Sequence, residues 1–229
     1  FNSEEKINYK FDTNSQDGFF PFRSESAKDN PIKDLKEFFH VYPNTNLPNF
    51  LSKNTNLLYS ELVSLGNTLL GWLDDLTPNN IKSEFSESLF NMSKGSDRNL
   101  LRVLHYPPVE GEVEQGAIRA AAHEDINLIT LLVSGSQPGL EAMDMNGVWH
   151  KVPVDKGMIT VNVGDMLQMA SNKYFPSTSH RVVNPENTKQ NVSRFSLPMF
   201  MHPRNEVILR SGITAYDYLQ ERLKEINLK

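Results

Sequence analysis

Three side chains, distant in the sequence, have the chemistry to hold one metal ion. His123 and Asp125 are separated by a single residue, and His180 follows 57 residues after His123. Side chains two apart in a β-strand share a face, so His123 and Asp125 can approach one ion while Glu124 points away. Two imidazoles and one carboxylate are the ligands of a non-haem Fe(II) centre that leaves positions open for reactants. A closed zinc site would need a fourth ligand, which we do not find.

A second pair of residues could bind an acidic co-substrate. Arg194 and Ser196 lie shortly after His180 and share one face of a predicted strand. A guanidinium binds a carboxylate through two parallel hydrogen bonds, and the neighbouring hydroxyl can add another. The co-substrate could be held there with its other end on the iron. The simpler alternative for Arg194 is a surface salt bridge, which contributes little to stability.

Composition narrows the class of protein. The 229 residues carry a net charge of −5 with scattered Lys and Arg, so no basic surface for nucleic acid is expected. No apolar run is long enough for a membrane span, and the start lacks the apolar core of a signal peptide. The absence of cysteine excludes disulfides and thiolate-bound metals. We therefore expect a cytoplasmic protein, and because the chain begins at Phe1 we expect an upstream segment to be missing.

Helices are expected mainly near the two ends of the chain. Residues 1–30 are polar and broken by Gly and Pro, so they should form a surface segment anchored by phenylalanines. Asn followed by Pro favours a short helix over 31–39. Apolar residues at steps of three and four predict a long helix over 55–76 and a shorter one over 81–91. A last helix is expected over 214–227.

The middle of the chain has the texture of a β structure. Eight short strands are expected, separated by turns that include a hairpin signal at Asn146-Gly147. Their predicted ranges are 100–106, 117–122, 126–133, 139–144, 148–152, 158–163, 180–183 and 194–201. This number of strands predicts a mainly β fold with flanking helices (α+β), built on a double-stranded β-helix or jelly roll. The expected division is a helical N-terminal region at 1–97, the core at 98–203 and a C-terminal extension at 204–229.

Several segments of the sequence resemble the isopenicillin N synthase-like family of Fe(II)/2-oxoglutarate-dependent dioxygenases. They are LRVLHYPP, AAHEDINLITLLVSGSQPGLEAM, ITVNVGDMLQMASNKYFPSTSHRVVNP and RFSLPMF, with weaker likeness in EEKINYK and KDLKEFFH. The resemblance covers nearly all of the chain. It implies the following roles: Fe(II) ligands His123, Asp125 and His180, and 2-oxoglutarate-binding residues Arg194, Ser196 and Tyr106. Plant members of the family often have Asn at the position that Leu104 occupies here. This difference weakens the assignment of Tyr106, which lies in the same segment.

The resemblance also implies an activity. The protein would oxidise an unactivated C–H bond of a small molecule with 2-oxoglutarate and O2, releasing succinate and CO2. Hydroxylation, desaturation and cyclisation are all open outcomes, and a monomer is the family expectation. One alternative is an oxidase of the isopenicillin N synthase type that uses no 2-oxoglutarate. Another is a non-enzymatic jelly-roll binding module that retains the three ligands.

The remaining polar residues have simpler interpretations. His40, His105, His150 and His202 have no partner at ligand spacing and should be structural or exposed. Asp165 follows a strand as Gly164-Asp165, where a turn or helix cap is favoured over catalysis. Met199, Met201 and Phe195 could belong to the core or to a substrate pocket. Residues 19–28 and 91–97 are candidate pocket covers because they are irregular.

Overall fold

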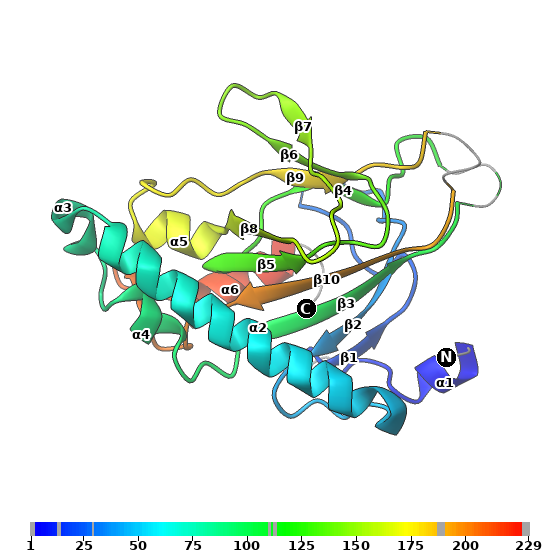
Figure 1. Ribbon diagram of the computed structural model, residues 1–229, viewed down its shortest axis with the longest axis horizontal. Coiled ribbons are helices and arrows are strands. Elements are labelled where there is room, and N and C mark those ends of the chain that lie inside the picture. Colours follow the sequence, from blue (N-terminus) through cyan, green and yellow to red (C-terminus); the bar gives the residue numbers. More distant parts are fainter. Residues whose placement is uncertain are drawn as a thin grey trace.

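Two antiparallel β-sheets form the centre of the protein, with one long helix across the larger sheet (Figure 1). The computed structural model describes residues 3–12, 15–28, 30–109, 111, 114–186 and 191–225. The helices are α1 Ser3–Ile7, α2 Asn49–Leu76, α3 Asn79–Lys82, α4 Leu89–Ser93, α5 Asp165–Ala170 and α6 Ala215–Glu225. The strands are β1 Gly18–Phe20, β2 Glu37–Val41, β3 Leu100–Tyr106, β4 Ala120–His123, β5 Ile129–Val133, β6 Leu140–Met143, β7 Trp149–Lys151, β8 Ile159–Val163, β9 His180–Val182, β10 Arg194–Met201, β11 Ile208–Arg210 and β12 Ile213–Thr214.

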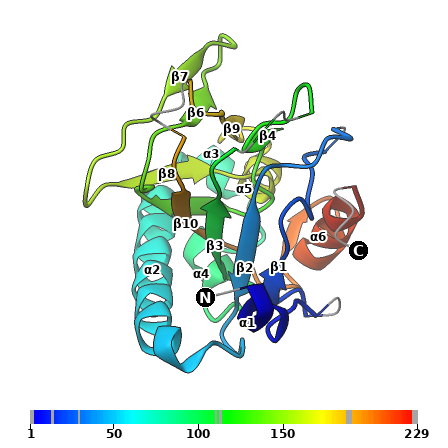
Figure 2. The ribbon, with the colours of Figure 1, turned by 90° about the vertical axis from the view of Figure 1, so that its right-hand side faces the viewer.

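The strand order is that of a jelly roll. The major sheet has the order β1-β2-β3-β10-β5-β8, and the minor sheet has the order β4-β9-β6-β7. All pairs within these sheets are antiparallel, and β10 lies between β3 and β5. Figure 2 shows α2 on one side of the major sheet and α6 on the other. The predicted double-stranded β-helix with flanking helices is confirmed.

Alternation along β3 and β10 gives the major sheet two different faces. On one face Leu101, Met199 and Met201 are fully buried in the cluster that includes Leu62 and Leu70 of α2. The residues between them point to the opposite face, toward the minor sheet. Burial of the first face supplies most of the apolar area that holds the fold together.

Close packing between α2 and the sheet depends on a glycine. Gly66 lies on the buried stripe of α2 between Leu62 and Leu70, four residues from each. A Cβ atom at this position would lie only 2.6 Å from the Met201 sulfur. Met199 and Met201 are therefore core residues, which decides the question left open by the sequence. Phe195 instead is about half exposed and stacks on His105.

The N-terminal part of the chain differs from prediction. The helix expected over 31–39 is wrong, because Glu37–Val41 is strand β2 and pairs with β3. Phe38 of β2 is buried against Phe20, and this long-range packing outweighs the local Asn-Pro helix signal. The expected surface segment likewise contributes strand β1 to the edge of the major sheet. Phe20 acts as the predicted anchor, whereas Phe22 is exposed.

Other boundaries agree more closely. Strands β3 and β10 have the predicted bounds, and α2 begins six residues before the predicted start. The helix expected over 81–91 is two short helices, α3 and α4, separated by turns. The hairpin at Asn146-Gly147 joins β6 to β7, with Gly147 in the left-handed region at φ 79°. In the part of the chain that the structure describes, no helix combines the length and apolar character needed to cross a membrane.

Candidate active site

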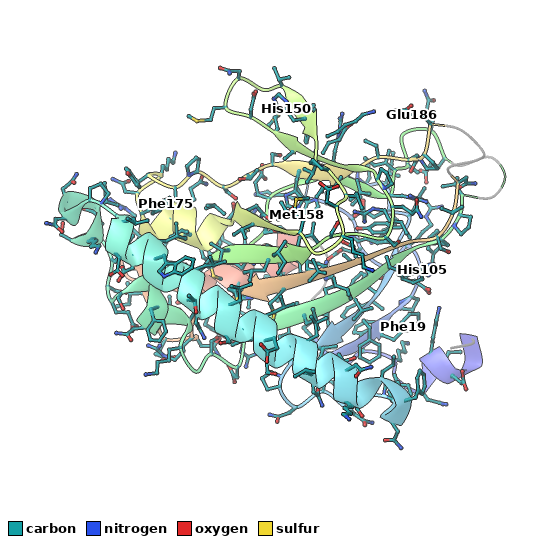
Figure 3. The ribbon with its side chains drawn as sticks, in the orientation of Figure 1. Phe19, His105, His150, Met158, Phe175 and Glu186 are labelled. Carbon is teal, nitrogen blue, oxygen red and sulfur yellow. The ribbon has the colours of Figure 1, made fainter. Side chains whose placement is uncertain are left out.

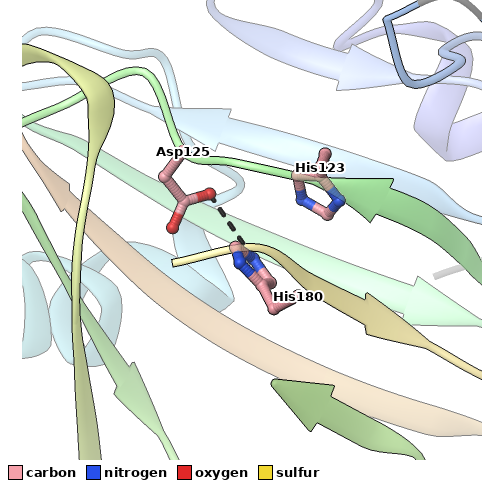
Figure 4. Close-up of side chains that lie close together, drawn as sticks. All are labelled: His123, Asp125 and His180. Carbon is pink, nitrogen blue, oxygen red and sulfur yellow. Dashed lines mark ion pairs between the residues drawn. The ribbon is translucent and has the colours of Figure 1, made fainter. Parts of the chain in front are cut away.

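Pairing of β4 with β9 brings the two candidate histidine ligands together. His123 ends β4, His180 begins β9, and the two are directly opposite in the register. Their ring centroids are 4.4 Å apart (Figure 4). Asp125 follows β4, and its Oδ1 lies 3.6 Å from Nε2 of His180. One ligand atom from each residue lies within 4.8 Å of the others, and this is the one such group in the described ranges.

Backbone carbonyls orient both imidazoles toward a common point. Nδ1 of His123 lies 2.7 Å from the carbonyl oxygen of Ala121, and Nδ1 of His180 lies 3.0 Å from that of Thr178. A carbonyl only accepts, so each Nδ1 carries the proton and donates it. The lone pair on each Nε2 is therefore left for a metal, as is usual for histidine ligands.

Two donors fix the Asp125 carboxylate through the same oxygen. Thr130 Oγ1 donates to Asp125 Oδ2 at 2.6 Å, and Asn162 Nδ2 donates to it at 2.8 Å. Asn127 Nδ2 in turn donates to Thr130 Oγ1, which leaves the threonine proton for Asp125. Because Oδ2 is occupied, Oδ1 is the oxygen presented to a metal beside His180. Neutral imidazoles and one such oxygen suit a divalent ion such as Fe(II).

The protonation states of His123 and Asp125 suit metal binding. Burial, together with the neighbouring His180, lowers the pKa of His123 to about 4, so its ring is neutral at pH 7. Burial alone would raise the pKa of Asp125. The two histidines and the hydrogen bonds from Asn162 and Thr130 outweigh this, and its pKa lies below the usual value.

The inner face of the major sheet lines a cavity of about 340 Å³ that also contains the three ligand candidates. β3 contributes Leu100, Arg102, Leu104 and Tyr106, and β10 contributes Arg194, Ser196, Pro198 and Phe200. These are the alternate residues that point away from α2. The volume lies within the usual range for small-molecule sites. Glu124 follows the end of β4; it is exposed to solvent and also belongs to the cavity lining, but it does not join the group of candidate ligands.

Arg194, Ser196 and Tyr106 meet at one end of this cavity. All three are buried, with exposed fractions of 1, 4 and 3%. Arg194 is directly opposite Tyr106 in the β3–β10 pair, and its guanidinium lies 5.2 Å from the tyrosine ring centre. Nε of Arg194 donates to the carbonyl oxygen of Gln137, but Nη1 is buried without a hydrogen-bond partner among the described residues. An unpartnered buried cation favours an anionic ligand at this place.

A second buried cation, Arg119, stands near this end. Its side chain is 2% exposed, and Nη2 donates to the carbonyl oxygen of Val192. Burial lowers the pKa of Arg119, and the charge of Arg194 lowers it further. We did not predict Arg119 as a site residue from the sequence. The one feature that could have indicated it is the position of an arginine within the short apolar run before His123.

The other four histidines lie outside the group of candidate ligands. Figure 3 shows His150 on the β6–β7 hairpin, where it pairs with Asp144. His105 bonds to Glu37 and Ser193, and His40 accepts a hydrogen bond from Arg102. His202 does line the cavity, where burial lowers its pKa to about 4.

Two further segments close over the cavity. Residues 25–28 and three α6 side chains, Leu219, Arg222 and Leu223, belong to its lining, whereas 91–97 do not. Asp165 is the first residue of α5 rather than its cap, which is Gly164. Its Oδ2 lies 3.2 Å from the Tyr218 hydroxyl and 3.3 Å from Nη2 of Arg222, so it docks α6 on the core.

Comparison with known proteins gives consistent matches. The model of the 2OG-Fe(II) oxygenase superfamily matches residues 97–203. A Shewanella oneidensis protein of known structure, classed as an oxygenase, is 49% identical with a TM-score of 0.85, covering 98% of this chain and 80% of that one. A proline hydroxylase from Petromyces alliaceus is 30% identical, over 86% of this chain and 70% of that protein. A 2-oxoglutarate-dependent dioxygenase from Didymella fabae is 36% identical over 48% of this chain and 33% of that protein. The chain thus spans only about a third to two fifths of the length of several curated relatives.

Proposed function

The chain belongs to the 2OG-Fe(II) oxygenase superfamily, and from this we propose that it oxidises a C–H bond of a small molecule. Hydroxylation is the outcome that we propose first, with desaturation or cyclisation on the same site as variants. The observation that carries the proposal is the convergence, in one cavity, of three ligand atoms and a buried arginine whose Nη1 has no hydrogen-bond partner among the described residues.

His123, Asp125 and His180 are the proposed Fe(II) ligands. Each histidine presents Nε2, because its Nδ1 proton is held by a backbone carbonyl. Asp125 presents Oδ1, because Thr130 and Asn162 occupy Oδ2. A metal held by only these three protein ligands would keep coordination positions available for reactants.

Arg194, Ser196 and Tyr106 are the proposed binding residues for the distal carboxylate of 2-oxoglutarate. Arg194 offers Nη1, which has no partner among the described residues, and the Ser196 hydroxyl shares its strand face. Burial strengthens this recognition, because the charge of Arg194 is poorly screened there. Nearby Arg119 adds positive charge at the same end.

The protein contributes ligation, orientation and exclusion of water. Fe(II) held by these residues would supply the oxidising power from 2-oxoglutarate and O2, with succinate and CO2 as co-products. Residues 25–28 and α6 cover the cavity in which this happens. The paired strands β4 and β9 of the minor sheet hold His123 opposite His180, so the reactants meet a rigid centre.

Succinate formation tests the proposal. Purified protein with Fe(II), O2, 2-oxoglutarate and a small-molecule library should release succinate, and the Asp125→Ala variant should release none above background. Asp155→Ala, the same change at an exposed turn residue, is the matched control and should behave as wild type. Turnover of a substrate without 2-oxoglutarate would instead support the oxidase alternative. Oxygen consumption that survives Asp125→Ala would show that the active centre lies elsewhere.

We also propose a cytoplasmic monomer. The absence of cysteine suits a reducing compartment, in which iron stays ferrous. Sedimentation of the purified protein at several concentrations tests the monomer, and a concentration-dependent dimer would contradict it.

A further inference from the structure

The cavity has an arginine at each of its two ends. Arg194 is opposite Tyr106 in the antiparallel β3–β10 pair, and Phe200 is opposite Leu100. Arg98 precedes Leu100 by two residues and also lines the cavity. Positions 100 and 106 are roughly 20 Å apart along an extended strand. Arg98 and Arg194 therefore lie at opposite ends of the same strand pair.

The proposed metal lies between these ends, nearer to Arg98 than to Arg194. Thr130, which bonds to the Asp125 ligand, is opposite Phe200 in the β5–β10 pair. A 2-oxoglutarate molecule that is bound to the metal and reaches Arg194 is a five-carbon diacid, about as long as two extended residues or roughly 7 Å. Such a molecule extends from the metal away from Arg98. That end of the cavity is left for a second molecule.

Most cavity-lining cations are already neutralised by the protein. Nζ of Lys36 lies 2.6 Å from Glu25 and 2.8 Å from Asp34, and Arg102 pairs with both oxygens of Glu25. These four buried charges cancel. They leave no net charge for a ligand.

Two further lining cations form ion pairs with carboxylates that do not belong to the cavity lining. Lys28 pairs with Glu225, and Arg222 pairs with Glu225 and Asp165, although none of these carboxylates belongs to the lining. The cavity lining as a whole has six lysines and arginines against four carboxylates, in a chain whose net charge is −5. Its charge is opposite in sign to that of the whole protein.

Apart from Arg194, Arg98 is the lining cation that the protein neutralises least. Its Nε is buried and makes no hydrogen bond within the described residues. Asp97 Oδ1 lies 3.2 Å from that Nε without hydrogen-bond geometry, and the Asp97 side chain is 68% exposed. Such an exposed pair contributes little and is readily exchanged for another anion. The neighbouring lining residues Leu100 and Phe200 are apolar.

We propose that the primary substrate is a small carboxylic acid whose carboxylate binds Arg98 while its apolar body lies over Leu100 and Phe200, beside the metal. This inference rests on the proposed function, since it assigns the substrate class of the same site. The arginine at one end selects the acidic co-substrate, and the arginine at the other end selects the acid to be oxidised.

Binding of matched acids and amides tests the inference without turnover. The probes are short aliphatic and aromatic monocarboxylates and their primary amides, titrated by calorimetry into protein loaded with Mn(II) and 2-oxoglutarate under nitrogen. The best acid should bind wild type about tenfold or more tightly than its amide, as expected for a charge-assisted pair. Arg98→Gln should reduce that preference below about threefold. Arg98→Lys should retain part of it, because lysine keeps the charge without the planar fork.

Arg210→Gln makes the same change at a cation that does not line this cavity, and it should keep the full preference. Circular dichroism and thermal unfolding establish that each variant is folded. Equal binding of acids and amides to wild type, a preference that survives Arg98→Gln, or no measurable binding of any acid would overturn the inference. Consumption of 2-oxoglutarate by the wild-type protein tests the proposed function separately.

Discussion

Replacing Thr130 by valine removes one hydrogen bond from the Asp125 ligand while keeping the shape of the side chain. In the native protein Thr130 Oγ1 donates to Asp125 Oδ2 at 2.6 Å, and Asn162 donates to the same oxygen at 2.8 Å. In the variant Asn162 alone holds that oxygen. The carboxylate can then rotate, so Oδ1 is less firmly directed to the point shared with His123 and His180.

The size of the effect follows from the charge on the acceptor. A hydrogen bond to a charged group contributes about 1.5–3 kcal/mol, and each 1.4 kcal/mol is a factor of ten in an equilibrium constant. We therefore expect Thr130→Val to raise the dissociation constant for Fe(II) by about 10- to 100-fold. This agrees with the usual effect of removing a group that orients a metal ligand.

Anaerobic calorimetry of Fe(II) or Mn(II) binding to the apoprotein measures this change. Thr160→Val is the matched control, because Thr160 lies two residues before Asn162 on β8. In the described part of the chain its hydroxyl makes no hydrogen bond to the three ligand candidates. Metal affinity should be unchanged in Thr160→Val. If Thr130→Val binds metal as tightly as wild type, or if both variants weaken binding equally, the role assigned to the Thr130 hydroxyl is wrong.

Three further predictions concern the co-substrate, the core and pH. Arg194→Lys should raise the KM for 2-oxoglutarate by about tenfold or more, because lysine cannot form two parallel hydrogen bonds to a carboxylate. Succinate release at varied 2-oxoglutarate concentration measures the KM, and an unchanged value would contradict the prediction. In urea unfolding, Gly66→Ala should lower the free energy of unfolding by about 1–3 kcal/mol, because the added Cβ would clash with Met201. Gly71→Ala should instead raise the free energy of unfolding by about 0.5–1 kcal/mol, because an added Cβ there would meet no neighbouring atom within 4 Å. His202 has a pKa of about 4 when folded and about 6.5 when unfolded, so the stability it contributes is present above pH 6.5 and is lost as pH falls toward 4. Between pH 7.5 and 5 the apoprotein should lose about 2 kcal/mol through this residue, and His202→Gln should lose correspondingly less.

The β core could be predicted because its pattern is local. β3 and β10 are short runs rich in apolar residues, and irregular segments bound them on both sides, so their limits follow from the sequence. The two-residue period of a strand places Arg194 and Ser196 on one face. β2 could not be identified in this way, because its place in the sheet depends on pairing with β3, about 60 residues further along the chain.

The site was predicted only in part, for a related physical reason. The histidines and Asp125 have side chains whose chemistry is recognisable wherever they stand. His123 is the last residue of β4 and Asp125 lies beyond it. The expectation that both side chains share one face of a strand is therefore only approximately correct. Thr130, Asn162 and Arg98 are residue types that occur throughout proteins. Their roles depend on which side chains lie next to them in the fold. That information resides in the strand register, which a single sequence does not specify.

The two-faced major sheet separates stability from chemistry within single strands. Odd-numbered positions of β3, such as Leu101, pack on α2, and even-numbered positions, such as Arg102, face the cavity. The same division runs along β10. During evolution a cavity-facing residue could be exchanged, and a new molecule accepted, while every neighbour in the packed layer stayed in place. One scaffold can in this way give rise to enzymes that act on unrelated compounds.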